Sequence, residues 1–398
     1  MNEGTFAVYH QQLMTSPENH HGLTATPATF LCAGFIFLVS YFTYFHNFQQ
    51  PQSFFWDENY HVTTAQKYLN GYFFMENHPP LGKLLIALGE KILDASANDV
   101  QFTDVNYARG DFTDGFSITG YRFIPALLGW FTAPIFFLIF LLITRSPLSA
   151  TLLSFLYVFD NALIVHLRGA MLEGPLIFFT ALTILLFLLI IEWHNEGAYF
   201  KICSFLFGIT FALVITTKLI GLILVLLIPA IFLKLLPNWN KSVDCLAHII
   251  IGFLITYVAV WQIHFSLART VHPPLERRGY FTASEEYKQI LHTGKQFSPL
   301  SFPIMLRDSI RFVRYKNRGV PKLDLCKVGE NGSPFFFWPV GARSINYRWE
   351  TPDGQTYRYL YLQANPVVWW SAFLAVIFAG SYFIGTVFFA PQKKPRQR

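Results

Sequence analysis

The sequence predicts an all-α protein that crosses a membrane several times. Of its 398 residues, 53% are hydrophobic and only 14% are charged, which is too apolar for a soluble domain with a hydrated surface. Several uncharged runs approach the roughly 20 residues that a helix needs to cross a bilayer. These runs cover residues 28–45, 123–143, 148–159, 175–191, 202–217, 219–233, 246–265 and 367–389. We expect about eight spans, or one fewer if 202–233 forms a single interrupted segment.

The first apolar run predicts a retained membrane helix and not a signal peptide. Mostly polar residues precede it, and no small-residue cleavage pattern follows it. The expected organisation then has four parts. They are an N-terminal tail at 1–27, a transmembrane core at 28–265 that includes an outer segment at 47–120, a second outer segment at 266–364, and a last helix with a basic tail at 365–398.

The short connections predict the orientation, because lysine and arginine accumulate in short cytosolic loops. If the helices alternate, the basic residues of the short loops and of the C-terminal tail fall on one side, which we expect to be cytosolic. These residues are Arg145, Lys201, Lys234, Lys241, Lys393, Lys394, Arg396 and Arg398. The two long segments then lie outside the cytosol, and we expect the N-terminal tail inside it.

The two outer segments differ in charge. Segment 47–120 has 4 lysines and arginines against 9 aspartates and glutamates, whereas segment 266–364 has 15 against 8. Long segments are translocated largely regardless of charge, so the basic segment does not contradict the orientation. An anionic lipid headgroup or the acidic first segment is a natural counter-charge. A solvated loop of mixed charge is the alternative.

Local patterns predict ordered elements in both outer segments. In the first, a polar helix begins at Asp57 and ends before Gly71. A second helix follows the proline pair at 79–80, and its apolar residues recur at the spacing of a helix that lies in the membrane interface. These residues are Leu81, Leu84, Leu85, Leu88 and Ile92. In the second segment, glycine and proline breaks before aromatic stretches near Tyr347 and 357–361 indicate a small outer subdomain.

Asp57 and Glu58 form an adjacent acidic pair about a dozen residues after the first span, where a lipid-borne substrate would meet them. A carboxylate there can accept the proton of an attacking hydroxyl, and partial burial would raise its pKa toward a useful range. The alternative is structural: Asp57 caps a helix and Glu58 interacts favourably with the helix dipole.

Cationic residues at the same predicted boundary are candidates for binding phosphate. The string 78–83 (HPPLGK) is the most distinctive, since a free helix start and a lysine can hold a phosphate. Alternatively, Lys83 reaches from an interfacial helix to water. Charges at the outer boundary of the spans, namely Arg122, Arg168 and Glu173, are costly unless they are paired or used. The arginines can bind phosphate bidentately or anchor to lipid headgroups.

Metal and disulfide chemistry have weaker support. Asp57, Glu58, His61 and His78 carry ligand groups suited to zinc or manganese, but their spacing matches no closed structural site, so we expect no metal. Of the four cysteines, only Cys326 falls in an outer segment, so no disulfide framework is expected.

Taken together and in this order, these strings resemble the protein O-mannosyltransferases, enzymes of the GT-C fold that use dolichyl-phosphate-mannose. The matching strings are Trp56-Asp57-Glu58, Gly71, His78-Pro79-Pro80-Leu81-Gly82-Lys83, Arg122-Phe123-Ile124-Pro125-Ala126 with Gly129, Arg168-Gly169-Ala170-Met171-Leu172-Glu173, Lys218-Leu219-Ile220-Gly221 and Asn365-Pro366-Val367-Val368-Trp369-Trp370. The resemblance runs from about residue 30 to residue 372, and the ordered set is far more specific than any one string.

The resemblance implies that a mannosyl or related hexosyl residue passes from a polyprenyl-phosphate sugar to Ser or Thr hydroxyls of exported proteins, with inversion. Asp57 would be the catalytic acidic residue, with Glu58 beside it in the site. The residues expected to bind the lipid-phosphate donor are His78, Lys83, Arg122, Arg168 and Glu173. The scheme needs no metal, cofactor, nucleotide sugar or nucleic-acid partner. Its partners are the polyprenyl-phosphate sugar, the acceptor protein and the membrane lipids.

Two departures from the family qualify this expectation. Animal and fungal members insert a β-trefoil domain that 266–364 cannot hold, which favours a bacterial-type enzyme in a cytoplasmic membrane with its site facing outside. Members also have more spans, which predicts a truncated, split or naturally short form. The rivals are a lipid-to-lipid transferase of the same superfold, such as those that move aminoarabinose to lipid A, and a non-catalytic membrane subunit or transporter. The histidine before Pro-Pro-Leu and the Gly-Lys after it favour the mannosyltransferase.

Overall fold

The architecture comes from a computed structural model. It describes residues 26–96, 112, 114–195, 197–236, 238–272, 277–318, 322–327, 330, 332–340, 342–343, 345–350, 355, 358–363 and 365–388. The expected basic C-terminal tail and nearly all of the expected N-terminal tail lie outside the described residues.

Six helices are long and apolar enough to cross a membrane, which confirms a multi-pass membrane protein. They are α2 (Pro27–Ser40) continued by the π-helical turn η1 (Tyr41–Phe45), α5 (Thr119–Thr144), α8 (Glu173–Glu192), α9 (Gly197–Thr217), α11 (Trp239–Leu267) and α15 (Pro366–Phe388). All eight predicted runs are helical. Six of the eight qualify as full spans by length and apolarity, and the other two are broken or short.

The first of these runs is α6 (Pro147–Val158) with α7 (Asn161–Leu167), which meet at a bend of 62° and would make a seventh span if counted together. The bend lies at Asp160, whose side chain accepts a hydrogen bond from the Leu163 amide at 2.9 Å and so starts a new helix. The second run is the 3₁₀ helix η3 (Leu219–Leu226) with α10 (Leu227–Leu235), which is shorter than the other spans.

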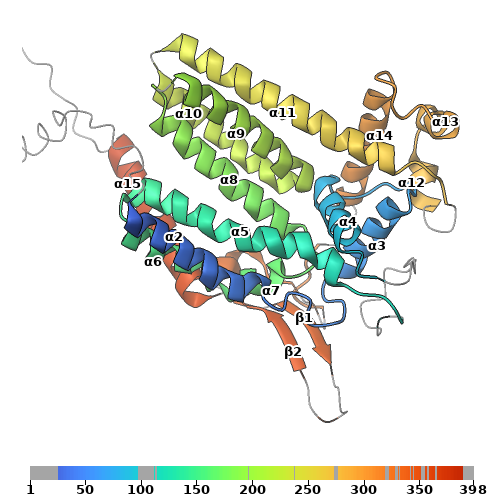
Figure 1. The fold of residues 1–398 in the computed structure, drawn as a ribbon, viewed down its shortest axis with the longest axis horizontal. Coiled ribbons are helices and arrows are strands. Elements are labelled where there is room, and N and C mark those ends of the chain that lie inside the picture. Colours follow the sequence, from blue (N-terminus) through green and yellow to red (C-terminus); the bar gives the residue numbers. More distant parts are fainter. Residues whose placement is uncertain are drawn as a thin grey trace, which may run out of the picture.

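The long helices form a layered bundle (Figure 1). Helices α5, α8, α9 and α11 run side by side, and α2 and α6 cover the outer flank of α5. The segment from η3 to α10 returns along α9 to the start of α11. The two ends of the bundle therefore differ, since short connections meet at one end and the long segments gather at the other.

The two long segments are joined directly at that second end. The Phe73 amide donates to Thr270 O at 2.7 Å, and the Thr270 amide donates to Gly71 O at 2.9 Å. An apolar cluster that includes Phe73, Phe265 and Tyr287 continues the contact. The first outer segment and the start of the second therefore share one packed region at the end of α11.

The first outer segment folds as the sequence predicts. Helix α3 (Glu58–Leu69) begins after Asp57, and Gly71 follows it with a φ of 68°, a left-handed conformation that suits glycine. Helix α4 (Leu81–Leu93) begins after Pro80. The apolar residues Leu88 and Ile92 of α4 are exposed, whereas Lys83 and Glu90 are buried. This inverted pattern is that of a helix whose apolar side faces lipid.

The second outer segment contains more structure than predicted. It holds α12 (Arg277–Thr282), α13 (Glu285–Thr293), α14 (Phe302–Arg318), the 3₁₀ helix η4 (Phe335–Val340) and a two-stranded antiparallel sheet of β1 (Ile345–Glu350) and β2 (Arg358–Leu362). The hairpin ends, Ile345 and Leu362, pack against Phe55 and Met171. The all-α class therefore holds for the bundle, with one small hairpin beside it.

Two glycines allow α9 and α11 to pack closely. A Cβ atom at Gly208 would lie 2.1 Å from Ile249 O, and one at Gly252 would lie 2.3 Å from Phe205 O. Both obstacles are backbone atoms, so a side chain could be accommodated only by moving one helix relative to the other.

We expect Gly208→Ala to lower the free energy of unfolding by about 1–3 kcal/mol, the usual range for overpacking. The measurement is the temperature at which the detergent-solubilised protein loses its monodisperse elution peak. The matched control is Gly380→Ala in α15, where a Cβ atom would meet nothing within 4 Å. Equal thermal stability of the two variants would contradict the close packing.

Candidate functional site

Ionisable side chains from five elements gather where the outer segments meet the bundle. Asp57 directly precedes α3, Glu76 and His78 lie in the loop before α4, and Lys83 lies in α4. The start of α8 supplies Glu173, and the junction of α9 and η3 supplies Lys218. The site is thus built from both the first outer segment and the ends of membrane helices.

Asp57 is held in an unusual backbone position. Trp56 before it has a φ of 49°, a left-handed conformation that is strained for a bulky residue and that often marks a functional site. Asp57 occupies the N-cap position of α3, and its carbonyl accepts from the Tyr60 and His61 amides at 3.1 and 3.2 Å. Its side chain makes no capping hydrogen bond and is exposed. The carboxylate is therefore free of the structural role that the sequence left open.

The surroundings of Asp57 favour a proton-accepting carboxyl group. Loss of hydration and the neighbouring charge of Glu173 raise the pKa of Asp57, although Lys218, His166 and Lys83 act in the opposite direction. A raised pKa makes the carboxylate a stronger base than an ordinary aspartate. The same influences indicate that these four charged or titratable neighbours lie within electrostatic range of Asp57.

Glu173 contacts two side chains, those of His166 and Lys218. His166 Nε2 lies 2.8 Å from Glu173 Oε2, and Lys218 Nζ donates to Glu173 Oε1. The side chains are partly exposed, Lys218 at 27%. Glu173 therefore orients Lys218 at the edge of the site and balances its charge.

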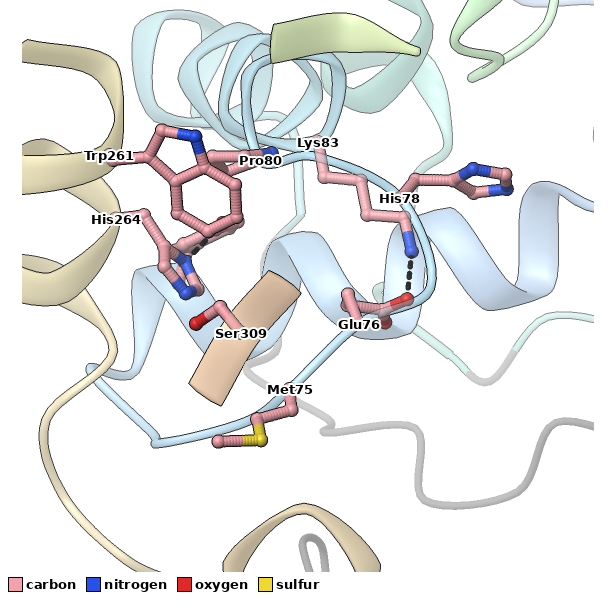
Figure 2. Close-up of a pocket in the computed structure, with 9 residues that line it drawn as sticks. Met75, Glu76, His78, Pro80, Lys83, Trp261, His264 and Ser309 are labelled. Carbon is pink, nitrogen blue, oxygen red and sulfur yellow. Dashed lines mark hydrogen bonds and ion pairs between the residues drawn. The ribbon is translucent and has the colours of Figure 1, made fainter. Parts of the chain in front are cut away.

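Lys83 is paired with a glutamate that the sequence analysis did not single out. Lys83 Nζ lies 2.5 Å from Glu76 Oε2 (Figure 2). The Thr64 hydroxyl donates to Glu76 Oε1 at 2.6 Å. Burial alone would raise the pKa of Glu76, but Lys83 and Thr64 lower it to about 2. Burial and the charge of Lys83 lower the pKa of His78 to about 4, so His78 is neutral near pH 7.

Glu58 and Arg122 form a fully buried ion pair. Arg122 Nε and Nη2 donate to the two carboxylate oxygens of Glu58 at 2.6 and 2.7 Å, and neither side chain is exposed to solvent. The remaining guanidinium donors bond to Gln49 O, Pro51 O and Ser53 O. Glu58 also accepts from the Phe55 and Ala170 amides at 3.1 and 2.7 Å. We call this set the Glu58–Arg122 clamp.

The clamp encloses two residues, Arg122 and Glu58, that the sequence analysis expected to face the substrates. All five N–H donors of Arg122 are used inside the protein, so in this structure the guanidinium presents no donor to a phosphate. Glu58 is likewise enclosed, and it holds the chain around Asp57 without facing the same open space. Arg168 lies apart from the clamp and donates through Nη2 to His46 O and Asn47 O at 2.8 and 2.6 Å.

A small pocket lies beside the Lys83–Glu76 pair and is closed on its far side by α11 and α14 (Figure 2). Its lining residues are Tyr68, Met75, Glu76, His78, Pro80, Lys83, Trp261, His264 and Ser309. The cavity of about 10 Å³ has room for about one water molecule. The Tyr68 hydroxyl lies 2.8 Å from His264 Nδ1 and ties α3 to α11.

Three residues of this cluster, Glu76, His166 and Lys218, carry no distinctive signal in the sequence. Glu76 lies two residues before His78, but an acid in a loop has many uses. His166 lies between the apolar runs 148–159 and 175–191 and belongs to none of the matching strings. Lys218 was recognised only as part of a string. Within the alternative metal set, Glu58 is paired with Arg122.

The fold is shared with a solved membrane glycosyltransferase. The complex of S. cerevisiae protein O-mannosyltransferases Pmt1 and Pmt2 bound to the sugar donor aligns with a TM-score of 0.56 and 19% identity, over 67% of this chain and 37% of that chain. Fold and site together define a multi-pass membrane protein with a cluster of ionisable side chains at one end of its helix bundle.

The family follows from the sequence. A family model described as dolichyl-phosphate-mannose-protein mannosyltransferase matches residues 34–272, and the chain belongs to this family. A Candida albicans relative, dolichyl-phosphate-mannose–protein mannosyltransferase 1, is 32% identical over 151 residues, which cover 37% of this chain and 16% of that protein. Danio rerio protein O-mannosyl-transferase 1 is 28% identical over 250 residues, 58% of this chain and 33% of that protein. The chain thus spans less than half the length of these relatives.

We expect Glu58→Ala to lower the free energy of unfolding by about 3–5 kcal/mol, because it leaves the buried Arg122 charge without its partner. The control is Glu192→Ala, which breaks the exposed pair with Arg145 and should cost about 0–1 kcal/mol. Denaturation in detergent, followed by loss of protease resistance, measures both. If the two variants resist the protease equally, the clamp does not stabilise the fold.

Proposed function

We propose that this protein transfers a mannosyl residue from a polyprenyl-phosphate donor to Ser or Thr hydroxyls of proteins. Membership of the mannosyltransferase family supports the class of reaction. The observation that carries the proposal is Asp57, whose carboxylate is exposed, uncapped and raised in pKa beside cationic groups at the end of the bundle. That combination suits a base that meets a lipid-borne substrate.

In this mechanism Asp57 accepts the proton of the acceptor hydroxyl while the hydroxyl oxygen attacks the anomeric carbon. The bond between that carbon and the phosphate oxygen breaks at the same time, and the sugar carbon inverts. Negative charge develops on the leaving polyprenyl phosphate, so cations at the site lower the barrier. Charge stabilisation and proton removal by side chains are the two chemical contributions that the mechanism asks of the protein, and neither requires a metal.

Exposure decides which cations are suited to meet the phosphate. The Lys218 side chain is partly open, whereas Lys83 is 3% exposed and Arg122 is enclosed. We therefore assign phosphate contact to Lys218, with Lys83 and His78 behind it. Arg168 is half-buried near the end of α2 and retains donors at Nε and Nη1 that suit a headgroup phosphate at the membrane boundary. Arg122 acts through Glu58 as a positioning residue.

The proposal places the site outside the cytosol of a cytoplasmic membrane. The basic short loops lie at the opposite end of the bundle from the site, as the positive-inside rule requires for that orientation. Between α11 and α15, the short second outer segment carries helices and a hairpin in place of a large inserted domain. Exported proteins would then reach Asp57 from the side of the membrane on which they emerge.

We expect Asp57→Asn to insert normally and to bind donor, yet to lose about 100-fold to 10,000-fold in transfer rate, because an amide cannot accept the proton. Transfer is measured from a defined polyprenyl-phosphate mannose to a Ser/Thr peptide in reconstituted membranes, with donor binding followed in parallel. The acceptor that becomes labelled, peptide or glycolipid, also distinguishes this function from lipid-to-lipid transfer.

The matched control for this experiment is Asp94→Asn. Asp94 ends α4 in a left-handed conformation with a φ of 47°, which Asn adopts readily, and it is exposed. The control should transfer at the wild-type rate. Asp57→Asn activity within threefold of the control would remove Asp57 from the role of general base.

The orientation can be tested on the unaltered protein, since Cys326 is exposed in the second outer segment while Cys203 and Cys245 are buried. We expect a membrane-impermeant maleimide to label Cys326 in intact cells, and Cys326→Ser to abolish that labelling. Labelling that appears only after the membrane is opened would place the segment, and the site packed against it, in the cytosol.

A further inference from the structure

One loop of the second outer segment exposes apolar residues and buries polar ones. Between α13 and α14, Phe297 and Leu300 are 68% and 82% exposed, whereas Gln296 and Ser301 are buried. The loop is not an irregular connection. The Ser298 amide donates to Lys295 O at 3.1 Å and the Ser301 amide to Ser298 O at 2.9 Å, so two successive turns present the apolar side chains outward. A loop facing water would have the reverse pattern.

The loop lies beside the membrane-spanning part of α11. Gln262 Nε2 donates to Gln296 O at 3.0 Å, and Gln262 precedes the end of α11 at Leu267 by about 7.5 Å at 1.5 Å per residue. At the other end of α11, Asp244 pairs with Lys201. An apolar layer about 30 Å thick that begins after Asp244 takes about 20 residues and ends near His264. The Gln262–Gln296 bond therefore holds the loop at the level where the hydrocarbon layer meets the headgroups.

Basic residues follow on α14, directly after this loop. Arg307, Arg311, Arg314 and Arg318 recur at four- and three-residue spacing, which places them on one side of α14, opposite the buried Met305 and Phe312. Arg307 pairs with Glu286 at 3.0 Å. Within the described residues, the other three arginines have no ion pair. Arginine beside an apolar anchor is typical of a surface that binds lipid phosphate groups.

We propose that the loop at 295–301 and the arginine side of α14 form a contact with the bilayer surface. Phe297 and Leu300 enter the boundary between headgroups and acyl chains, and Arg311, Arg314 and Arg318 bind headgroup phosphates. The contact continues the lipid-facing wall of α11, where Ile263 and Leu267 are also exposed. Since Ser309 of α14 lines the pocket beside Lys83, the contact fixes that side of the site relative to the membrane surface.

The depth of the loop can be measured with spin labels in lipid nanodiscs. Phe297→Cys and Leu300→Cys are labelled in a Cys326→Ser background, with Glu285→Cys as the control because Glu285 has an 83% exposed side chain. We expect labels at both loop positions to be several-fold more accessible to oxygen, relative to a water-soluble nickel chelate, than the control label. Accessibility equal to that of the control would overturn the contact.

The unaltered protein provides a second measurement that does not depend on a variant folding. Phospholipid carrying a diazirine near the headgroup is photolysed with the wild-type protein in nanodiscs, and the tryptic peptide from Gln296 to Arg307 is analysed for a lipid adduct. We expect the adduct, and its absence would overturn the proposal. Replacing Arg311, Arg314 and Arg318 with Gln should reduce adduct formation at least twofold, and unchanged labelling would remove the arginines from the contact.

Discussion

The buried ion pair between Glu58 and Arg122 is the interaction on which the site depends. A guanidinium and a carboxylate without solvent are stable only if every donor and acceptor is used, and the surrounding carbonyls and amides complete that requirement. The partners come from the loop after α2, from α3, from α5 and from the turn before α8. One charged contact therefore ties the first outer segment to the bundle next to Asp57.

The same need for paired donors and acceptors explains why the adjacent acids Asp57 and Glu58 differ in their surroundings. Glu58 is enclosed, and Arg122 holds its carboxylate in a fixed geometry. Asp57 faces outward, lacks a hydrogen-bonding partner for its side chain in the described structure, and feels the charge of Glu173. Two adjacent residues thus place one carboxylate inside the protein and the other at its surface, next to the strained backbone of Trp56.

The sequence predicted the helices that are determined by neighbouring residues along the chain. Apolar run length found the spans, Asp57 and Gly71 bounded α3, and the proline pair started α4. It did not predict which charges pair, because Lys83 with Glu76 and Lys218 with Glu173 meet only through tertiary packing. It also missed α13, although Ser284, Glu285 and Glu286 form a helix start and Gly294 ends the helix with a φ of 66°.

The winding of the segment after Lys218 has a consequence for how the chain threads the bilayer. As an α-helix, this segment would be clearly shorter than its neighbours. Eight residues in the tighter 3₁₀ form rise about 2.0 Å each, and nine α-helical residues rise about 1.5 Å each, so η3 and α10 together reach about 30 Å. That length equals the thickness of a typical hydrocarbon layer. Overwinding lets a short stretch make a full return crossing, with Lys218 at the boundary where the crossing begins.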